Sequence, residues 1–285
     1  GDNLAALDAL AAARTVVQLA YLDPPFFMHR EHLRTKRRRG RDGVERSTAP
    51  AFDDRWPDLA SYLIALRQRL RRIRDLLSDD GCMVVHVDPT TSHYIKVMCD
   101  ELFGSDAFAS EIVWRYRRWP AKTPNFQRMH DVLLRYLKDP RTKPRFQQRY
   151  EPLAASTVAT WGKTKQLAEF RDGRRKRSTR TSEPTPGTPL SDVWEISVIA
   201  AVAKERTGYP TQKPQALLTR VIETCSFAGD CVLDAYAGSG TTLVAAAALG
   251  RRAIGVDASE EAIAVARERL TAQAIAHRVE RATRQ

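Results

Sequence analysis

Two short motifs near opposite ends of the chain carry residues that could do chemistry. The first, Asp23-Pro-Pro-Phe26, follows a largely apolar segment. Prolines lack a backbone N–H, so this turn offers a carboxylate and carbonyl acceptors without competing donors. An exocyclic amino group presents two N–H donors, and Phe26 adds a flat face on which a flipped base can stack. A strand end followed by a rigid Asp-Pro turn is the purely structural explanation of the same residues.

The second motif, Asp234-Ala-Tyr-Ala-Gly-Ser-Gly240, is a glycine-rich turn between a short apolar strand and an Ala-rich helix. Such glycines let the backbone approach a ligand closely, although they also occur in ordinary strand–helix packing. Asp257 lies 19 residues beyond Gly238, near the spacing of about 20 at which an acidic side chain reaches a ribose hydroxyl. The turn lacks the Lys of a phosphate loop, and Leu243 replaces the third glycine of an NAD fingerprint.

The two motifs, in this order, resemble the bacterial amino-methyltransferases of the β class. In that family the amine motif comes first and the S-adenosylmethionine (SAM) motif comes last. The resemblance covers most of the chain, from the opening GDNLAALDAL to its best stretch, VWEISVIAAVAKERTGYPTQKPQALLTRVIETCSFAGDCVLDAYAGSGTT. It implies an α/β, Rossmann-like SAM methyltransferase fold, with a mostly parallel seven-stranded sheet, helices on both faces and a circularly permuted motif order.

The resemblance also implies roles for the matching residues. Asp23 and the Pro24 carbonyl would accept hydrogen bonds from the target amine, Pro25 would complete the turn, and Phe26 would stack on the base. The implied SAM-binding residues are Asp234, Ala235, Tyr236, Ala237, Gly238, Gly240, Thr241, Asp257 and the segment Thr211, Gln212, Lys213 and Pro214, which closes over the cofactor. Two departures stand out: Ala235-Tyr236 replaces the usual Pro-Phe, and Phe26 replaces the more frequent Tyr.

The chemistry implied is methyl transfer to a base amine. SAM carries its own activated methyl group, so the protein must mainly position the amine, and no metal is required. An Asp at the start of the amine motif favours adenine N6 in this family, whereas Ser favours cytosine N4. Cytosine N4 remains the nearest alternative, followed by an RNA base methyltransferase and a catalytically silent DNA-binding subunit. The expected partner is duplex DNA with a flipped base; a homodimer and a separate restriction endonuclease remain open.

Composition favours a polyanionic partner. The 285 residues carry a formal net charge of +12, which favours salt-dependent nucleic-acid binding, although an Arg-rich proteome would give the same balance. The four cysteines, at positions 82, 99, 225 and 231, have neither zinc nor disulfide spacing and are expected to be buried thiols in a reducing cytoplasm. The sequence has no apolar run of membrane-spanning length and no secretory signal, so we expect a cytoplasmic protein, associated with the nucleoid through DNA.

Two basic segments interrupt the α/β pattern. Residues 28–55 are expected to form a mobile loop beside the amine motif, and residues 143–189 an inserted target-recognition region. The catalytic domain then comprises residues 1–142 and 190–285. The candidate nucleic-acid contacts are Arg30, Arg34, Lys36, Arg37, Arg38, Arg39, Arg174, Arg175, Lys176 and Arg177. Solvated charge runs are the alternative explanation of both segments.

The apolar periodicity predicts the framework that positions these motifs. We expect strands near 16–22, 82–88, 111–116, 131–137, 231–235 and 252–256, and helices near 57–77, 92–103, 214–226, 241–249 and 259–276. The strands that end at Asp23 and Asp234 should be neighbours, so that their carboxyl ends open one crevice. His86 is expected to be a packed core residue and His130 a structural one; none of the histidines is assigned to catalysis.

Overall fold

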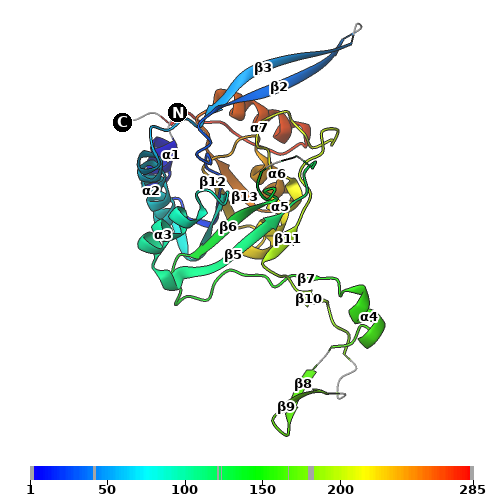
Figure 1. Cartoon of the computed structure of the whole chain (residues 1–285). Helices are drawn as coiled ribbons and strands as arrows, with labels where there is room; N and C mark the ends of the chain where they lie inside the picture. The colour runs from blue at the N-terminus through cyan, green and yellow to red at the C-terminus, as the bar shows by residue number, and fades with distance from the viewer. Residues whose placement is uncertain are drawn as a thin grey trace. The chain divides into compact units, whose positions relative to one another are not determined.

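The fold comes from a computed structural model, which describes residues 3–40, 43–120, 122, 124–165, 167–178 and 183–282. The chain divides into two compact units. One consists of Gly1–Gln147 with Asp192–Gln285, and the other of Gln148–Ser191. Figure 1 labels the helices and strands of both units.

The larger unit is built on a seven-stranded sheet. Its spatial order is β11 (Val193–Glu195), β5 (Phe108–Arg115), β6 (His130–Leu137), β4 (Leu77–Val87), β1 (Val17–Leu22), β12 (Cys231–Asp234) and β13 (Arg252–Gly255). Only β6 runs antiparallel to its neighbours within this sheet. The predicted mostly parallel sheet is confirmed, and β1 pairs directly with β12 as expected.

Helices cover both faces of this sheet (Figure 1). The first group comprises α1 (Asn3–Ala12), α2 (Leu59–Leu76), α3 (Ser92–Phe103) and the short η1 (Ser105–Ala107), and the second comprises α5 (Gln215–Cys225), α6 (Thr241–Ala248) and α7 (Glu260–Ala272). The α2 helix shows why these segments fold so. Asp58 caps its N-terminus by accepting a 2.7 Å hydrogen bond from the Ser61 amide, and a helical stripe of apolar residues, including Leu66 and Leu70, is buried.

The central strands are apolar on both sides because helices cover both faces. Leu19, Ala20 and Leu22 of β1 are completely buried, as are Val84 and Val85 of β4. The four cysteines are also buried, as predicted. None of the helices in the described parts of the chain combines the length and apolarity needed to cross a bilayer.

The segment 28–55 is not the loop that the sequence suggested. It forms an antiparallel hairpin of β2 (Glu31–Gly40) and β3 (Gly43–Asp53). Gly40 and Gly43 pair at its distal end, while at its base His32 stacks on Phe52 with ring centroids 4.4 Å apart. The loop prediction was wrong because the basic composition does not reveal strands that pair through their backbones and through an aromatic contact at the base.

The smaller unit contains β7 (Tyr150–Glu151), α4 (Ala155–Trp161), β8 (Leu167–Arg171), β9 (Arg174–Ser178) and β10 (Thr188–Pro189). Antiparallel pairing of β7 with β10 brings the two ends of the unit together. No side chain whose burial is described in this unit is fully buried. The unit overlaps the predicted insertion 143–189 and ends two residues beyond it, at Ser191; its role in target recognition stays a prediction.

Candidate active site

The carboxyl ends of β1 and β12 open into one pocket. Tyr21 pairs with Asp234 across the two strands, and Asp23 follows two residues later. The pocket has a volume of about 700 Å³, which is within the usual range for a small-molecule site. Both sequence motifs line it, so the structure brings together residues that are more than 200 positions apart in the chain.

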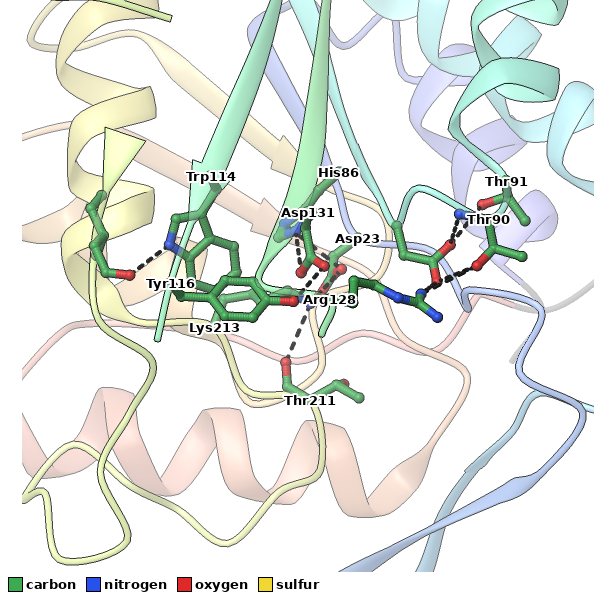
Figure 2. A network of polar contacts seen from close by, with 12 residues as sticks. Asp23, His86, Thr90, Thr91, Trp114, Tyr116, Arg128, Asp131, Thr211 and Lys213 are labelled. Carbon is green, nitrogen blue, oxygen red and sulfur yellow. Dashed lines mark hydrogen bonds and ion pairs between the residues drawn. The ribbon is translucent and has the colours of Figure 1, made fainter. Parts of the chain in front are cut away.

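Asp23 is held by a lysine at the wall of this pocket. The Lys213 Nζ lies 2.6 Å and 2.5 Å from the two carboxylate oxygens of Asp23, and 3.4 Å from the Thr211 carbonyl oxygen (Figure 2). The same nitrogen lies 4.9 Å from the centre of the Phe26 ring. An ammonium group is therefore bound between a carboxylate and an aromatic face, which is a cation–π arrangement.

The two prolines of the amine motif have different surroundings. The Pro25 carbonyl accepts a 2.8 Å hydrogen bond from the Tyr62 hydroxyl. None of the described residues donates a hydrogen bond to the Pro24 carbonyl, which remains an acceptor at the pocket. The completely buried Asp54 holds the residues that follow this turn. Its carboxylate accepts hydrogen bonds from the backbone amides of Phe27 and Met28 at 3.2 Å and 2.8 Å.

A buried polar network lies behind Asp23. His86 is completely buried, and its Nδ1 is 2.7 Å from the Tyr21 hydroxyl. Its Nε2 is 3.2 Å from Asp131 (Figure 2). Because a carboxylate only accepts, Nε2 carries the proton and, in neutral His86, Nδ1 accepts from Tyr21. Burial would raise the pKa of Asp131, but the hydrogen bonds from His86 and Tyr116 lower it below the usual value. His86 is thus a core residue, as predicted, whose Nδ1 lies 4.0 Å from Asp23.

The glycine turn after β12 has the shape that the motif predicted. Gly238 and Gly240 have φ angles of 49° and 74°, in the left-handed region that favours glycine. A Cβ atom at Gly240 would lie 2.8 Å from that of Ala266, so the turn is packed tightly on α7. Asp257 accepts 2.8 Å hydrogen bonds from the amides of Gly238 and Ser259, which hold its carboxylate beside the turn.

Burial changes the acidity of this end of the pocket. Desolvation raises the pKa of Asp234 to about 7, even though its carboxylate accepts hydrogen bonds from Thr242 and from the Tyr236 amide. Burial also raises the pKa of Asp257. The site therefore concentrates carboxylates whose ionised forms would be stabilised by a cationic ligand.

Most of the predicted site residues line the pocket. They are Asp23, Pro24, Pro25, Phe26, Thr211, Gln212, Lys213, Asp234, Ala235, Tyr236, Ala237, Gly238, Thr241 and Asp257. Gly240 shapes the turn without lining the pocket, and Pro214 precedes α5 as its N-cap.

Sequence reasoning missed other lining residues, among them Asn3, Asp54 and Tyr209. The Asn3 amide donates a 3.2 Å hydrogen bond to the Ala235 carbonyl, and Tyr209 packs on Gly238. A signal for Tyr209 was available in its position just before the Thr211–Pro214 segment. Asp54 gave none, because its neighbour Asp53 and the following Asp58 make it look like part of a polar helix start.

The predicted nucleic-acid contacts lie on two hairpins. Arg30 is exposed, whereas Arg34 is buried at the base of the β2–β3 hairpin in an ion pair with Glu261 of α7. Arg34 therefore anchors the hairpin. Arg174 is exposed on β9. The side chains of Lys36, Arg37, Arg38, Arg39, Arg175, Lys176 and Arg177 lie outside the described residues, although their backbones belong to β2 and β9.

Comparison with known proteins places the chain in a family. The DNA methylase (N6/N4) family matches residues 17–268. This range includes both motifs, the whole seven-stranded sheet and the smaller unit. The chain belongs to the N6/N4 DNA methylase family.

Individual relatives are more distant. The chain is 28% identical to the type II methyltransferase M.EcaI of Enterobacter cloacae over 90% of its own length and 65% of that protein. It is 28% identical to the DNA adenine methyltransferase YhdJ of Escherichia coli, over 95% and 81% of the two chains. It spans less than two thirds of the length of several of the relatives that it matches.

Solved structures support the same fold. The crystal structure of an M1.HpyAVI–SAM complex matches with a TM-score of 0.56 and 18% identity, over 95% of this chain and 97% of that one. At this identity the match establishes the fold alone: an α/β methyltransferase sheet, as the sequence predicted.

Proposed function

We propose that the chain is a SAM-dependent DNA methyltransferase that acts on the N6 amino group of adenine. The observation that carries the proposal is the Lys213 ammonium bound to Asp23 over the Phe26 ring. The pocket thus holds a nitrogen with N–H donors at the place where the amine motif predicts one. Family membership supports the reaction class, and the name of the adenine methyltransferase relative supports the choice of base.

The residues of the other end of the pocket fit SAM. This cofactor carries a sulfonium and an ammonium cation. The buried Asp234 and the half-buried Asp257 supply carboxylates with raised pKa values, which a nearby cation would ionise. The left-handed turn at Gly238 gives a close backbone approach, and Asp257 is positioned to accept from ribose hydroxyls. When bound, SAM supplies an activated methyl group.

The protein then has to bind and orient the amine. Asp23 and the Pro24 carbonyl would accept its two N–H bonds, and Phe26 would hold the base ring flat. These acceptors draw the nitrogen lone pair out of conjugation with the ring and point it across the pocket. After methylation the nitrogen must lose one proton, and Asp23 is the carboxylate placed to accept it or to pass it to water.

Lys213 cannot keep its present position during this reaction. Its ammonium contacts both oxygens of Asp23, which the target amine also needs. Base binding therefore displaces Lys213 from Asp23. Because Lys213 is only 9% exposed, the displaced ammonium needs a second anionic partner within the pocket. The carboxylate of SAM has the right charge.

The experiment that tests this function is mass spectrometry of nucleosides from unmethylated DNA that was incubated with the protein and methyl-deuterated SAM. We expect deuterated N6-methyladenine. Deuterated N4-methylcytosine would keep the mechanism and change the base. Labelling of RNA in a parallel reaction, with DNA unlabelled, would contradict the DNA substrate, and no label in either polymer would contradict the activity.

A further inference from the structure

An open groove adjoins the pocket and carries an exposed tryptophan. The groove has a volume of about 1880 Å³ and shares Tyr209, Pro210, Thr211 and Gln212 with the pocket. One wall comes from the base of the β2–β3 hairpin and another from residues 117–120 after β5. Trp119 in this second wall is 92% exposed, which is unusual for an indole in a folded protein.

The fold directs this wall toward the active site. Because β5 is parallel to β1 and β6 is antiparallel to both, the connection between β5 and β6 leaves the sheet at the edge where Asp23 lies. In sequence, residues 116–129 contain four basic side chains (Arg117, Arg118, Lys122 and Arg128) and no acidic one. A basic segment with an exposed aromatic ring is complementary to a polyanion with bases to stack.

The base of this connection is fixed to the rest of the protein. The Tyr116 hydroxyl donates a 2.9 Å hydrogen bond to Asp131, and the Tyr116 amide donates one of 2.9 Å to the Met129 carbonyl. Arg128 forms an ion pair with the buried Asp88, which directly follows β4. Nearer Trp119, the side-chain amide nitrogen (Nε2) of Gln127 donates a 2.8 Å hydrogen bond to the Trp119 carbonyl.

We propose that this groove binds the DNA strand next to the flipped nucleotide, and that Trp119 stacks on the face of a neighbouring base that the flipped nucleotide leaves uncovered. The proposal rests on the proposed function, because the flipped base is part of that function. Removing a nucleotide from a duplex leaves neighbouring bases with an uncovered face, and an aromatic side chain at the mouth of the pocket can cover it. Arg117 and Arg118 would contact the backbone of the same strand.

Phe126 provides a matched control within the same connection. It is 98% exposed, yet it is not among the residues that line the groove. If any exposed aromatic ring on this basic segment were enough, Phe126→Ala and Trp119→Ala would have equal effects. If the groove is the binding surface, only the tryptophan matters.

The test is the affinity of the full chain for a fluorescently labelled single-stranded oligothymidylate of about 20 nucleotides, longer than one binding site of this type. We expect Trp119→Ala and Trp119→Leu to weaken binding about tenfold, and Trp119→Phe, which keeps a stacking face, to weaken it about threefold or less. Phe126→Ala should bind like the wild type. Unchanged binding of Trp119→Ala, full affinity of Trp119→Leu, or an equal loss for Phe126→Ala would overturn the proposal.

This assay measures nucleic-acid binding by the groove independently of methyl transfer. It requires no methyl transfer, so a wild-type protein that fails to methylate DNA would sink the proposed function and leave the binding comparison interpretable. Thermal unfolding of each variant checks folding, and SAM affinity by calorimetry should be unchanged because Trp119 does not line the pocket.

Discussion

Asp234 is buried, so its ionisation should change the free energy of unfolding of the protein as the pH changes. Desolvation raises its pKa from 3.8 to about 7. The unfolded chain therefore loses this proton near pH 4, while the folded protein keeps it until about pH 7. Its contribution to stability is present at low pH and is lost as the pH rises through this window.

We predict that Asp234→Asn, without cofactor, gains stability relative to the wild type as the pH rises from about 4 to above 7, by up to about 4 kcal/mol. The amide has the same shape and never ionises. Urea unfolding across this pH range measures the difference. The control is Asp79→Asn, which makes the same substitution at an exposed position. A difference that does not change with pH would contradict the buried, proton-retaining carboxylate.

Asp257 is predicted to act on the cofactor instead of on the base. Its carboxylate is fixed beside the glycine turn by the amides of Gly238 and Ser259. We expect Asp257→Ala to weaken SAM binding by about tenfold or more, because a hydrogen bond to a charged group contributes about 1.5–3 kcal/mol. Calorimetry with SAM measures this, with Asp79→Ala as control. An unchanged dissociation constant would remove Asp257 from the cofactor site.

The sequence identified the residues at the carboxyl ends of strands better than those that support them. Asp23, Asp234 and Asp257 follow apolar runs, so pattern and spacing were enough to place them together. The Lys213–Asp23 contact depends on the path of a segment without regular structure before α5, which no periodicity describes. Asp54 is buried through tertiary packing alone, and its sequence neighbours gave no signal for that.

We expect the β2–β3 hairpin to contact DNA. Beyond its base, β2 carries four consecutive basic residues, Lys36, Arg37, Arg38 and Arg39. The base is tied to the rest of the protein by the Arg34–Glu261 ion pair and by a 3.2 Å hydrogen bond from the Thr35 amide to the Gly208 carbonyl. Changes beyond the base should therefore leave the pocket intact.

We predict that the double variant Lys36→Gln/Arg38→Gln binds duplex DNA more weakly and with a salt dependence that is shallower by up to about 2 in log–log slope, since each phosphate contact contributes about 0.9. Fluorescence anisotropy at several salt concentrations measures the slope. The control, Arg14→Gln/Arg71→Gln, removes the same charge from two other exposed positions. Equal slopes for both double variants would mean that only net charge matters.

Helices and strands could be predicted from the sequence where their hydrophobic pattern extended over several residues. Because helices cover both faces of the sheet, its central strands are continuous apolar runs and its helices carry an apolar stripe. These two patterns identified the long strands and helices. The seventh strand, β11, is only three residues long, with Val193 and Glu195 exposed and Trp194 buried, which is too short to show a period. The hairpin was missed because its strands are held by backbone pairing, so polar residues dominate them.

Across the whole molecule, catalysis and recognition of the DNA sequence are predicted to reside in different units. The pocket is lined by residues of the larger unit, and Gln148–Ser191 forms a separate compact unit. Its β7–β10 pairing brings its ends together, so a short glycine linker can replace it. We expect the shortened chain to bind SAM normally while it loses site-specific methylation of DNA. Sequencing of methylated positions and calorimetry measure the two properties; unchanged site preference would contradict the recognition role.

The central claim is that Asp23 binds the amino group that receives the methyl group. The direct measurement is the rate of transfer of labelled methyl from SAM to unmethylated DNA by Asp23→Ala, together with its SAM affinity. We predict a rate at least about a hundredfold lower with SAM affinity largely retained, because Asp23 is proposed to position the amine and not the cofactor. Wild-type turnover in Asp23→Ala would contradict it.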